Sequence, residues 1–360
     1  VLKNNTQTQI SLLFKKQSMS LKNLSVRKKI PKIYKSKILN QKVNKIFKKF
    51  EKSFKIDTNF IIAVSGGADS LALAFLTKVY SLKKNLNPRY FIVDHKLRKE
   101  STYEAYKVKK ILKSLKINSQ VLTWKGKKPV SNIQSLARSK RYELLFLKCK
   151  KLKISNLVLG HHIDDVIENF FLRMARGSGL KGLVSLGTNT QIENINLIRP
   201  LIEFDKRDLI FLSKFIFNFY VDDPTNDDIK FNRIKVRNLI KRFEDFGLDK
   251  KKFQLTIENL KKSDQSIKFY VEKNKKENSI FNYRKNELIL KDNFFDNSYE
   301  VIFRSLSDLI HLVGKKPNFV RGKKIENILN KIKEQKLRKE TLGGCVIKMV
   351  NHTVILTKEV

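Results

Sequence analysis

Residues 61–76 read IIAVSGGADSLALAFL, so that two apolar runs are separated by two glycines, two serines and an aspartate. The first run predicts a strand and the second a helix, which makes the intervening residues a turn at the carboxyl end of the strand. Ligands of open α/β sheets bind at that end. The free N–H groups of such a turn and the dipole of the following helix favour an anion. We therefore predict a phosphate-binding turn made of Ser65, Gly66, Gly67, Ala68 and Ser70.

Asp69 lies within this turn, and its carboxylate would by itself repel a phosphate. Mg²⁺ between the carboxylate and the phosphates resolves the conflict, because this ion binds through one or two carboxylates and substrate phosphates. An ordinary strand–turn–helix corner with a Ser or Asp cap is the simpler alternative. A Walker loop is excluded, because Gly-x-x-x-x-Gly-Lys-Ser/Thr occurs nowhere. The dinucleotide-like pattern GSGLKG at 177–182 is rejected, since it follows a predicted helix and not a strand.

The chain has 360 residues, enough for two domains, and 41% of them are hydrophobic, as in a globular protein. No apolar run approaches the roughly 18–20 residues that cross a bilayer, so we expect no membrane partner. The two cysteines, Cys149 and Cys345, form no CxxC pair, which excludes a zinc ribbon and a dithiol redox centre. A reducing cytoplasm is the expected location.

Basic residues dominate the charge of the chain. Lys and Arg number 76 against 34 Asp and Glu, and the formal net charge is +42. A coding bias that enriches Lys, Asn, Ile and Phe is one explanation. The size of the imbalance favours the other, a polyanionic partner, because basic surfaces attract phosphate backbones.

From residue 59 short apolar runs alternate with longer helical patterns, which is typical of a parallel sheet covered on both faces by helices. Strands are predicted at 60–64, 90–94, 120–124, 156–160 and 196–199, and helices at 69–82, 102–115, 133–151 and 164–176. Further helices are predicted at 205–219, 232–246 and 248–276. The last part predicts a strand at 287–291, helices at 299–313 and 322–335, and a hairpin at 345–357.

The expected fold class is therefore α/β, with a parallel-sheet domain, a helical connector and a small α+β C-terminal domain. Residues 1–50 contain no Asp or Glu, which sets them apart as a basic, partly disordered extension with a helix near 38–54. The expected divisions are this extension at 1–54, the sheet domain at 55–220, the connector at 221–280 and the C-terminal domain at 281–360.

A second group of polar residues lies in the stretch 157–179, LVLGHHIDDVIENFFLRMARGSG, which begins as a strand and becomes a helix. Asp165 and Glu168 share a face of that helix, and His161 and His162 end the strand. Two carboxylates can hold Mg²⁺, and a histidine can donate to a phosphate or substrate oxygen. A His/Asp transition-metal site and simple helix capping by Asp164 remain as alternatives.

Arg173 and Arg176 close the same helix. They either complement the helix dipole or reach forward to stabilise charge on a transferred group.

These motifs resemble those of the PP-loop ATP pyrophosphatases, whose signature is S-G-G-x-D-S, and among them the tRNA(Ile)-lysidine synthase family. SGGADS at 65–70 carries the first resemblance, which by itself implies only the use of ATP. Six further blocks stand in the family's order: VDHKLR (93–98), IQSLARSKRYELL (133–145), LGHHIDDVIENFFLRMARGSGLKGL (159–183), IRPLIEFDKRDL (198–209), DDPTNDDIKFNRIKVRNLI (222–240) and TLGGCVIKMVNHTVILTKE (341–359).

The resemblance implies a ligase that uses ATP and Mg²⁺. ATP would adenylate the C2 oxygen of the wobble cytidine in an isoleucine tRNA with a CAU anticodon and release pyrophosphate. The ε-amine of free L-lysine would then attack C2 and release AMP, leaving lysidine. Relatives are often dimeric, so a homodimer is one expectation for the oligomeric state.

The resemblance also implies roles for individual residues. Ser65, Gly66, Gly67, Ala68, Asp69 and Ser70 would form the ATP site, with Asp69 and Asp165 on the metal. His161 and Asp165 would be the catalytic pair, joined by Asp69 and Arg176. Arg138, Arg233 and Arg237 would contact tRNA or substrate.

This sequence departs from the family pattern in three places. Asn169 stands where the family has threonine after the second carboxylate, and a small loss is expected from this change. The basic extension has no counterpart, and the C-terminal part is short, so we expect one tRNA-binding domain fewer than in longer relatives.

Two other functions are compatible with part of this pattern. A 2-thiocytidine synthetase or another thiolating relative shares the turn, but needs cysteines in pairs. An idle tRNA- or ATP-binding protein is disfavoured by the intact set of Ser65, Asp69, His161 and Asp165.

Overall fold

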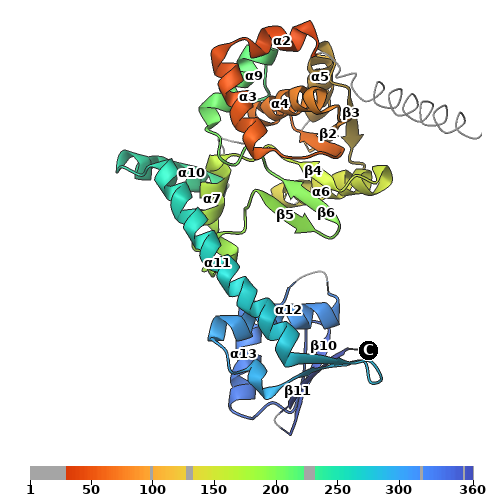
Figure 1. Cartoon of the computed structure of the whole chain (residues 1–360), viewed down its shortest axis with the longest axis vertical. Coiled ribbons are helices and arrows are strands. Elements are labelled where there is room, and N and C mark those ends of the chain that lie inside the picture. The colour runs from red at the N-terminus through yellow and green to blue at the C-terminus, as the bar shows by residue number, and fades with distance from the viewer. Residues whose placement is uncertain are drawn as a thin grey trace, which may run out of the picture. The chain divides into compact units, whose positions relative to one another are not determined.

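The computed structural model describes residues 30–97, 100–126, 133–222, 232–316, 319–351 and 353–359. The chain divides into two compact units, Val1–Gln254 and Leu255–Val360, which are described separately (Figure 1). No helix in the described ranges combines the length and the apolar character needed to cross a membrane.

A six-stranded sheet with the order β3-β2-β1-β4-β6-β5 forms the centre of the first unit. The predicted parallel sheet is confirmed, because β1 pairs in parallel with β2 and β4, β2 with β3, and β4 with β6. β5 pairs antiparallel with β6 at the edge and was not predicted. The strands are β1 (Phe60–Val64), β2 (Arg89–Asp94), β3 (Ser119–Thr123), β4 (Asn156–Val158), β5 (Asn189–Ile192) and β6 (Ile195–Ile198).

Helices cover both faces of this sheet, as the buried side chains of β1 illustrate. Phe60, Ile62 and Val64 belong to the core beneath α2 to α5 and α9, whereas Ile61 points into the core beneath α6. Figure 1 shows α3, α4 and α9 on one side of the sheet and α6 on the other. The helices are α2 (Lys32–Ile38), α3 (Gln41–Ser53), α4 (Ala68–Lys84), α5 (Ser101–Ser114), α6 (Ile133–Leu152), α7 (Ile163–Met174), α8 (Leu180–Leu183), α9 (Lys206–Phe217), α10 (Asn232–Asp245) and α11 (Lys250–Asn278).

The helices α2 and α3 correct the predicted boundary of the N-terminal extension. Val43, Phe47 and Phe50 on one face of α3 are buried against the sheet domain, because apolar residues recur there at helical spacing. Asn40 caps α3 by accepting hydrogen bonds from the amides of Lys42 and Val43. The sheet domain thus begins before residue 55. The remainder of the proposed extension, residues 1–29, lies outside the described residues.

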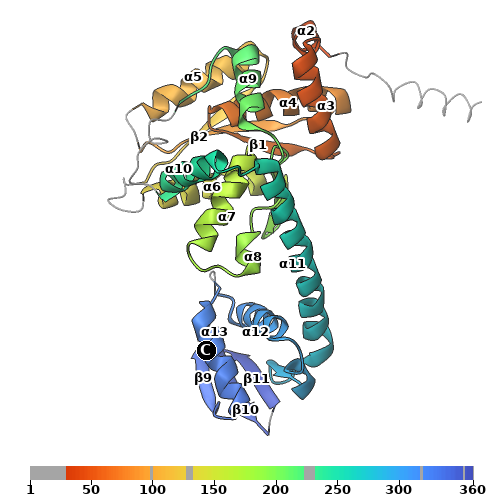
Figure 2. The ribbon, with the colours of Figure 1, turned by 90° about the vertical axis from the view of Figure 1, so that its left-hand side faces the viewer.

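The second unit is a small α+β domain, as predicted, with a five-stranded antiparallel sheet of order β7-β8-β11-β10-β9. Figure 2 shows α12 (Tyr299–Gly314) and α13 (Gly322–Lys333) on this sheet, where Leu306 and Ile328 enter the core. The predicted hairpin is β10 and β11, and His352 of its turn lies outside the described residues. The strands and the short 3-10 helix are β7 (Ser279–Asn282), β8 (Glu287–Leu290), η2 (Asp292–Phe294), β9 (Lys339–Leu342), β10 (Cys345–Val350) and β11 (Thr353–Lys358).

Candidate functional site

The turn from Ser65 to Gly67 joins β1 to α4 at the carboxyl edge of the sheet, where the sequence predicts a phosphate site. Gly66 has φ +92°, a conformation that side-chain-bearing residues rarely adopt. A Cβ there would lie 2.5 Å from Cγ2 of Val108, so the backbone approaches α5 too closely for any other residue. The Gly66 carbonyl accepts a hydrogen bond from the amide of Val221, 3.0 Å away.

The Ser70 hydroxyl holds the turn in shape from within. Its oxygen accepts hydrogen bonds from the amides of Ser65 and Gly66, both at 3.1 Å, and donates to the carbonyl of Gly67 at 2.9 Å. The side chain is buried, whereas Ser65 is exposed. Ser70 therefore organises the turn, and the exposed Ser65 hydroxyl donates to the Ser70 hydroxyl at 3.2 Å.

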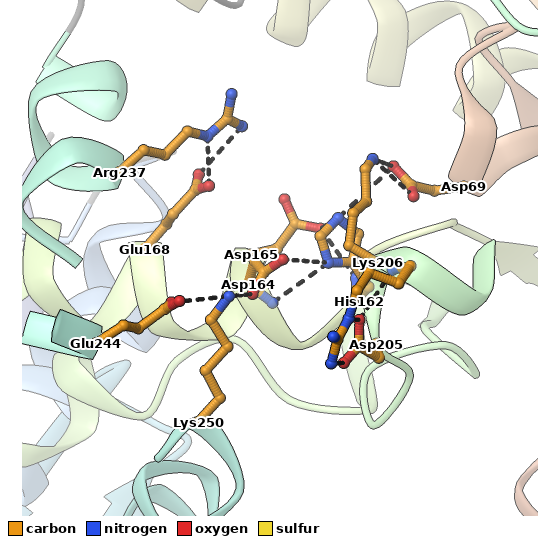
Figure 3. Close-up of polar contacts among 11 residues, drawn as sticks. Asp69, His162, Asp164, Asp165, Glu168, Asp205, Lys206, Arg237, Glu244 and Lys250 are labelled. Atoms are coloured by element: carbon orange, nitrogen blue, oxygen red, sulfur yellow. Dashed lines mark hydrogen bonds and ion pairs between the residues drawn. The ribbon is translucent and has the colours of Figure 1, made fainter. Parts of the chain in front are cut away.

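Asp69, in the first turn of α4, forms an ion pair with a lysine that is distant from it in sequence. The Nζ atom of Lys206, at the start of α9, lies 2.8 and 2.6 Å from its two carboxylate oxygens. α9 is anchored to the same turn, because Ser213 donates a hydrogen bond of 2.6 Å to the carbonyl of Ala68. Figure 3 shows the ion pair beside the imidazole of His162.

His162 is the N-cap residue of α7, and it lies between the two predicted metal ligands, Asp69 and Asp165. Its Nδ1 accepts a hydrogen bond from the amide of Asp164, and its own amide donates to Asp165 at 2.9 Å, so the two residues form a capping box. Its Nε2 lies 3.6 Å from Oδ2 of Asp69 and 3.7 Å from Oδ2 of Asp165. The cap is thus His162 rather than Asp164, and Asp69 and Asp165 converge on one imidazole nitrogen.

Gly160, just before the two histidines, brings β4 against the phosphate turn. A Cβ at this position would lie 3.3 Å from the backbone of Asp69 and Ser70. The two predicted groups of polar residues are therefore neighbours at one edge of the sheet.

His161 lies beside this cap and has an unused nitrogen. Its Nδ1 is buried and has no hydrogen-bond partner among the described residues. Burial lowers the pKa of His161 to about 4, and Arg199, Arg138 and Arg141 push it in the same direction against the opposing charge of Asp165. The imidazole is consequently neutral at pH 7.

The carboxylates of α7 do not all face the same ligand. Glu168 is buried and forms an ion pair with Arg237 of α10, with 2.5 Å between Nε and Oε1. Of the two carboxylates Asp165 and Glu168 that the sequence suggests for Mg²⁺, Glu168 is therefore already paired. Asp164 binds Lys250, 2.9 Å away. Burial raises the pKa of Asp165, but the two adjacent histidines, its hydrogen bond to the His162 amide and Arg233 bring it below the usual value, so it is ionised at pH 7.

The predicted arginines occupy different positions. Arg237 contacts Glu168 of α7 through their ion pair. Arg138 donates a hydrogen bond to the hydroxyl of Tyr142, and both residues belong to α6. Arg233 is exposed on α10, but its charge acts on Asp165. Arg176 is exposed beyond the end of α7 and makes no side-chain contact with the site in the described part of the chain, roughly 15 Å along the helix from Asp165.

The donor set suits a magnesium ion shared with phosphates better than a metal cage. No group of three or more His, Cys, Asp and Glu side chains in the described residues is arranged to hold a metal. Asp69 and Asp165 are two carboxylates beside an anion-binding turn, and Mg²⁺ completes such a pair with waters and substrate phosphates. The residues therefore fit Mg²⁺ bound together with ATP.

Sequence reasoning missed three residues of this site: Lys206, His162 as the cap, and Arg199. Lys206 and Arg199 both lie in the block IRPLIEFDKRDL, for which the resemblance implies no role of either residue. For Lys206, the sequence offers one signal: it directly follows the helix cap Asp205, which places it at the start of a helix.

The parallel sheet, the glycine turn with its serine clasp and the adjacent carboxylates together define a nucleotide-binding protein of the PP-loop class. A family described as "PP-loop domain" matches residues 35–243, more than half of the chain. A U34-tRNA thiolase, NcsA from Methanococcus maripaludis, has a similar fold, with a TM-score of 0.53 and 18% identity over 61% of this chain and 78% of that one.

Curated relatives narrow the class. The chain is 33% identical to the tRNA(Ile)-lysidine synthase of Orientia tsutsugamushi, over 85% of this chain and 71% of the relative. It is 30% identical to that of a Wolbachia strain from Brugia malayi, over 87% and 74%, and 32% identical to that of Rickettsia akari, over 83% and 69%. The chain belongs to the tRNA(Ile)-lysidine synthase family and is an enzyme, a ligase.

Proposed function

We propose that this enzyme converts the wobble cytidine of the isoleucine tRNA with a CAU anticodon to lysidine, using ATP and free L-lysine. The observation that carries the proposal is the meeting of two groups at one sheet edge. The phosphate turn with Asp69 lies against the histidine–aspartate group of β4 and α7, through Gly160 and His162. One site of this kind can hold a nucleotide and the group that it activates.

The first step is adenylation. The C2 oxygen of the cytidine attacks the α-phosphorus of ATP, the bond from that phosphorus to the bridging oxygen breaks, and pyrophosphate leaves. The amides at the start of α4, which have no partner within the helix, would bind the departing phosphates, and the ammonium of Lys206, 2.6 Å from Asp69, supports the negative charge that develops on them. Mg²⁺ held by Asp69 and Asp165 would offset phosphate charge when bound.

The second step is attack by the ε-amine of lysine on C2, after which AMP leaves with the oxygen that it activated. The attacking nitrogen must lose its surplus proton. His161 is neutral at pH 7 and offers an unpartnered buried Nδ1, and Asp165 is an ionised carboxylate beside it, which supports this pair as the acceptor of the proton.

The charge of the chain supports tRNA as the partner. A net charge of +42 attracts a polyanion and makes binding fall with salt. The helices of residues 221–280 and the C-terminal unit are the proposed tRNA contacts, with Arg233 nearest the reacting base. Recognition of the wobble base requires that it is turned out of its loop. A cytoplasmic location and a homodimer complete the proposal.

Sulfur transfer finds no support in the cysteines. Cys149 lies in the first unit and Cys345 in the second, and both are buried. Burial raises the pKa of each thiol to about 11, so neither is a thiolate at pH 7.

The test separates adenylation from tRNA binding. With ATP, Mg²⁺ and the CAU-anticodon tRNA but without lysine, the enzyme should release pyrophosphate and form adenylated tRNA. Asp69→Asn should lose pyrophosphate release and keep tRNA affinity measured by filter binding. Loss of tRNA binding in this variant would mean that Asp69 is structural, and contradicts the assignment.

A further inference from the structure

The segment that joins β6 to α9 leads directly to Lys206 but has no regular structure of its own. Residues 199–205 form turns and loop between the strand and the helix. Backbone of this kind lacks the hydrogen bonds of a helix or a sheet, so its position depends on contacts with its neighbours. The place of the Lys206 ammonium, 2.6 Å from Asp69, therefore depends on what holds this connecting segment.

Helix α3 holds the connecting segment at two backbone carbonyls. The Nζ atom of Lys49 donates a hydrogen bond of 2.6 Å to the carbonyl of Glu203, and it lies 4.5 Å from the centre of the Phe204 ring. The hydroxyl of Ser53, one turn later on α3, donates to the carbonyl of Pro200 at 3.3 Å. A residue far away in sequence thus fixes both the backbone and the adjacent ring just before α9 begins.

Phe204 links this contact to the start of α7. Its side chain is 1% exposed, and its carbonyl accepts a hydrogen bond of 3.4 Å from the amide of Ile163, the first residue of α7. Two residues further along the chain, Lys206 reaches Asp69. The connecting segment is therefore in contact with both halves of the candidate site, and Lys49 holds it between them.

A second lysine of α3 makes a similar ring contact at a different place. Lys42 lies 4.3 Å from the centre of the Phe211 ring and 3.5 Å from the carboxylate of Asp208. Lys42 and Lys49 are seven residues apart, so they share one face of α3, and Figure 1 shows this helix beside α9. Both lysines fasten α3 to its neighbour, but the partners of Lys42 lie beyond Lys206, within α9.

We infer that Lys49 is a positioning residue for ATP that acts through Lys206, an inference that rests on the role proposed for Lys206 at the phosphates. The Lys49 ammonium holds the Glu203 carbonyl and the Phe204 ring, so that α9 begins with Lys206 beside Asp69. Glu203 and Phe204 lie outside the phosphate turn. An effect of Lys49 on nucleotide binding must therefore pass along the connecting segment.

The test measures the Kd for ATP directly, by isothermal titration calorimetry on the full chain with Mg²⁺ and without tRNA or lysine. Lys49→Met removes the ammonium and keeps an unbranched apolar chain against the Phe204 ring. It should raise the Kd about 3- to 10-fold, the scale of one ordinary hydrogen bond. Lys49→Arg keeps the charge and a donor, and should recover most of the loss.

Two comparisons separate positioning from a general loss of stability. Lys42→Met removes a ring contact and an exposed ion pair from the same face of α3. It should lower the free energy of unfolding in urea about as much as Lys49→Met, while the Kd for ATP stays at the wild-type value. In a Lys206→Ala background, Lys49→Met should change the Kd no further, because the first residue acts through the second.

The inference is overturned if Lys49→Met leaves the Kd for ATP unchanged, if Lys42→Met raises it equally, or if the effects of Lys49→Met and Lys206→Ala add in the double variant. Since the measurement uses neither tRNA nor lysine, a failure of the proposed function is seen separately. A wild-type enzyme that binds ATP but does not modify tRNA would contradict the proposed function alone.

Discussion

Lys206 and Asp69 form an ion pair between helices 137 residues apart in sequence, with Nζ–oxygen distances of 2.8 and 2.6 Å. The pair joins the first residue of α9 to the first turn of α4, directly beside the phosphate turn. The lysine binds the same oxygens that the proposal gives to Mg²⁺. If Asp69 held Mg²⁺ as proposed, the ammonium would turn from Asp69 toward the phosphates of bound ATP.

Replacing Lys206 tests this exchange. Lys206→Ala removes a cation from the developing pyrophosphate, so the KM for ATP should rise about 10-fold or more. The same variant frees Asp69, so half-saturation in a Mg²⁺ titration of nucleotide binding should not move to higher concentration. Lys206→Arg keeps the charge and should recover most of the loss. Equal defects in both variants would argue against a charge effect.

Gly66 gives a stability prediction that separates backbone strain from steric overlap. Gly66→Ala combines a left-handed φ with an overlap onto Val108, and should reduce the free energy of unfolding by about 2–4 kcal/mol. Gly177→Ala is the matched control, since φ is +68° there and no atom lies within 4 Å of the added Cβ. It should cost about 1 kcal/mol. Urea unfolding measures both, and equal losses would contradict the role of Val108.

The Glu168–Arg237 pair predicts a pH dependence of stability. Burial raises the pKa of Glu168 despite Arg237, so the folded state holds this proton more tightly than the unfolded state. The contribution of Glu168 to the free energy of unfolding is therefore fully present at low pH and declines as the pH rises above about 4.5, the ordinary pKa of a glutamate. Arg237→Met leaves the buried carboxylate unpaired and should steepen the decline, costing about 1–3 kcal/mol near pH 7.

A double variant and a control check the assignment to this pair. Arg237→Met with Glu168→Gln should recover most of the loss at pH 7. Arg173→Met removes an exposed arginine of α7 and should leave the pH profile of urea unfolding unchanged. A profile of Arg237→Met that is parallel to the wild type would show that the carboxylate is not left unpaired.

His161 gives a prediction for NMR. Its imidazole should stay neutral as the pH is lowered and should titrate near pH 4. Since Arg138 is one of the charges that hold the pKa down, Arg138→Gln should move the midpoint upward, and Arg173→Gln should not. A wild-type midpoint near 6.5 would contradict both the buried environment of His161 and the effect of the nearby charges of Arg199, Arg138 and Arg141.

The fold was largely predictable because its signals are local. Apolar runs of five residues followed by helical periods predict β1 to β4 and their helices within a few residues. The edge strand β5 was missed because Asn189–Ile192 is short and mostly exposed, so it lacks an apolar pattern. The buried face of α3 was hidden by lysines that alternate with Val43, Ile46 and Phe50.

The site was predictable to the extent that it lies in single motifs. The turn at Ser65–Ser70 is complete within six residues, so its composition alone indicates an anion. The pairing of Lys206 with Asp69 depends on how α9 packs, which no local pattern contains. The two histidines also look equivalent in sequence, and only the structure distinguishes the cap, His162, from His161 with its unused nitrogen.

The most direct test of the account is the transfer of labelled L-lysine to tRNA. Purified enzyme with ATP, Mg²⁺ and the CAU-anticodon isoleucine tRNA should place the label in the wobble nucleotide, with one AMP and one pyrophosphate released per lysine. A tRNA whose wobble cytidine is replaced by uridine should take up none. If wild-type enzyme hydrolyses ATP but the label never enters the tRNA, the central claim is contradicted.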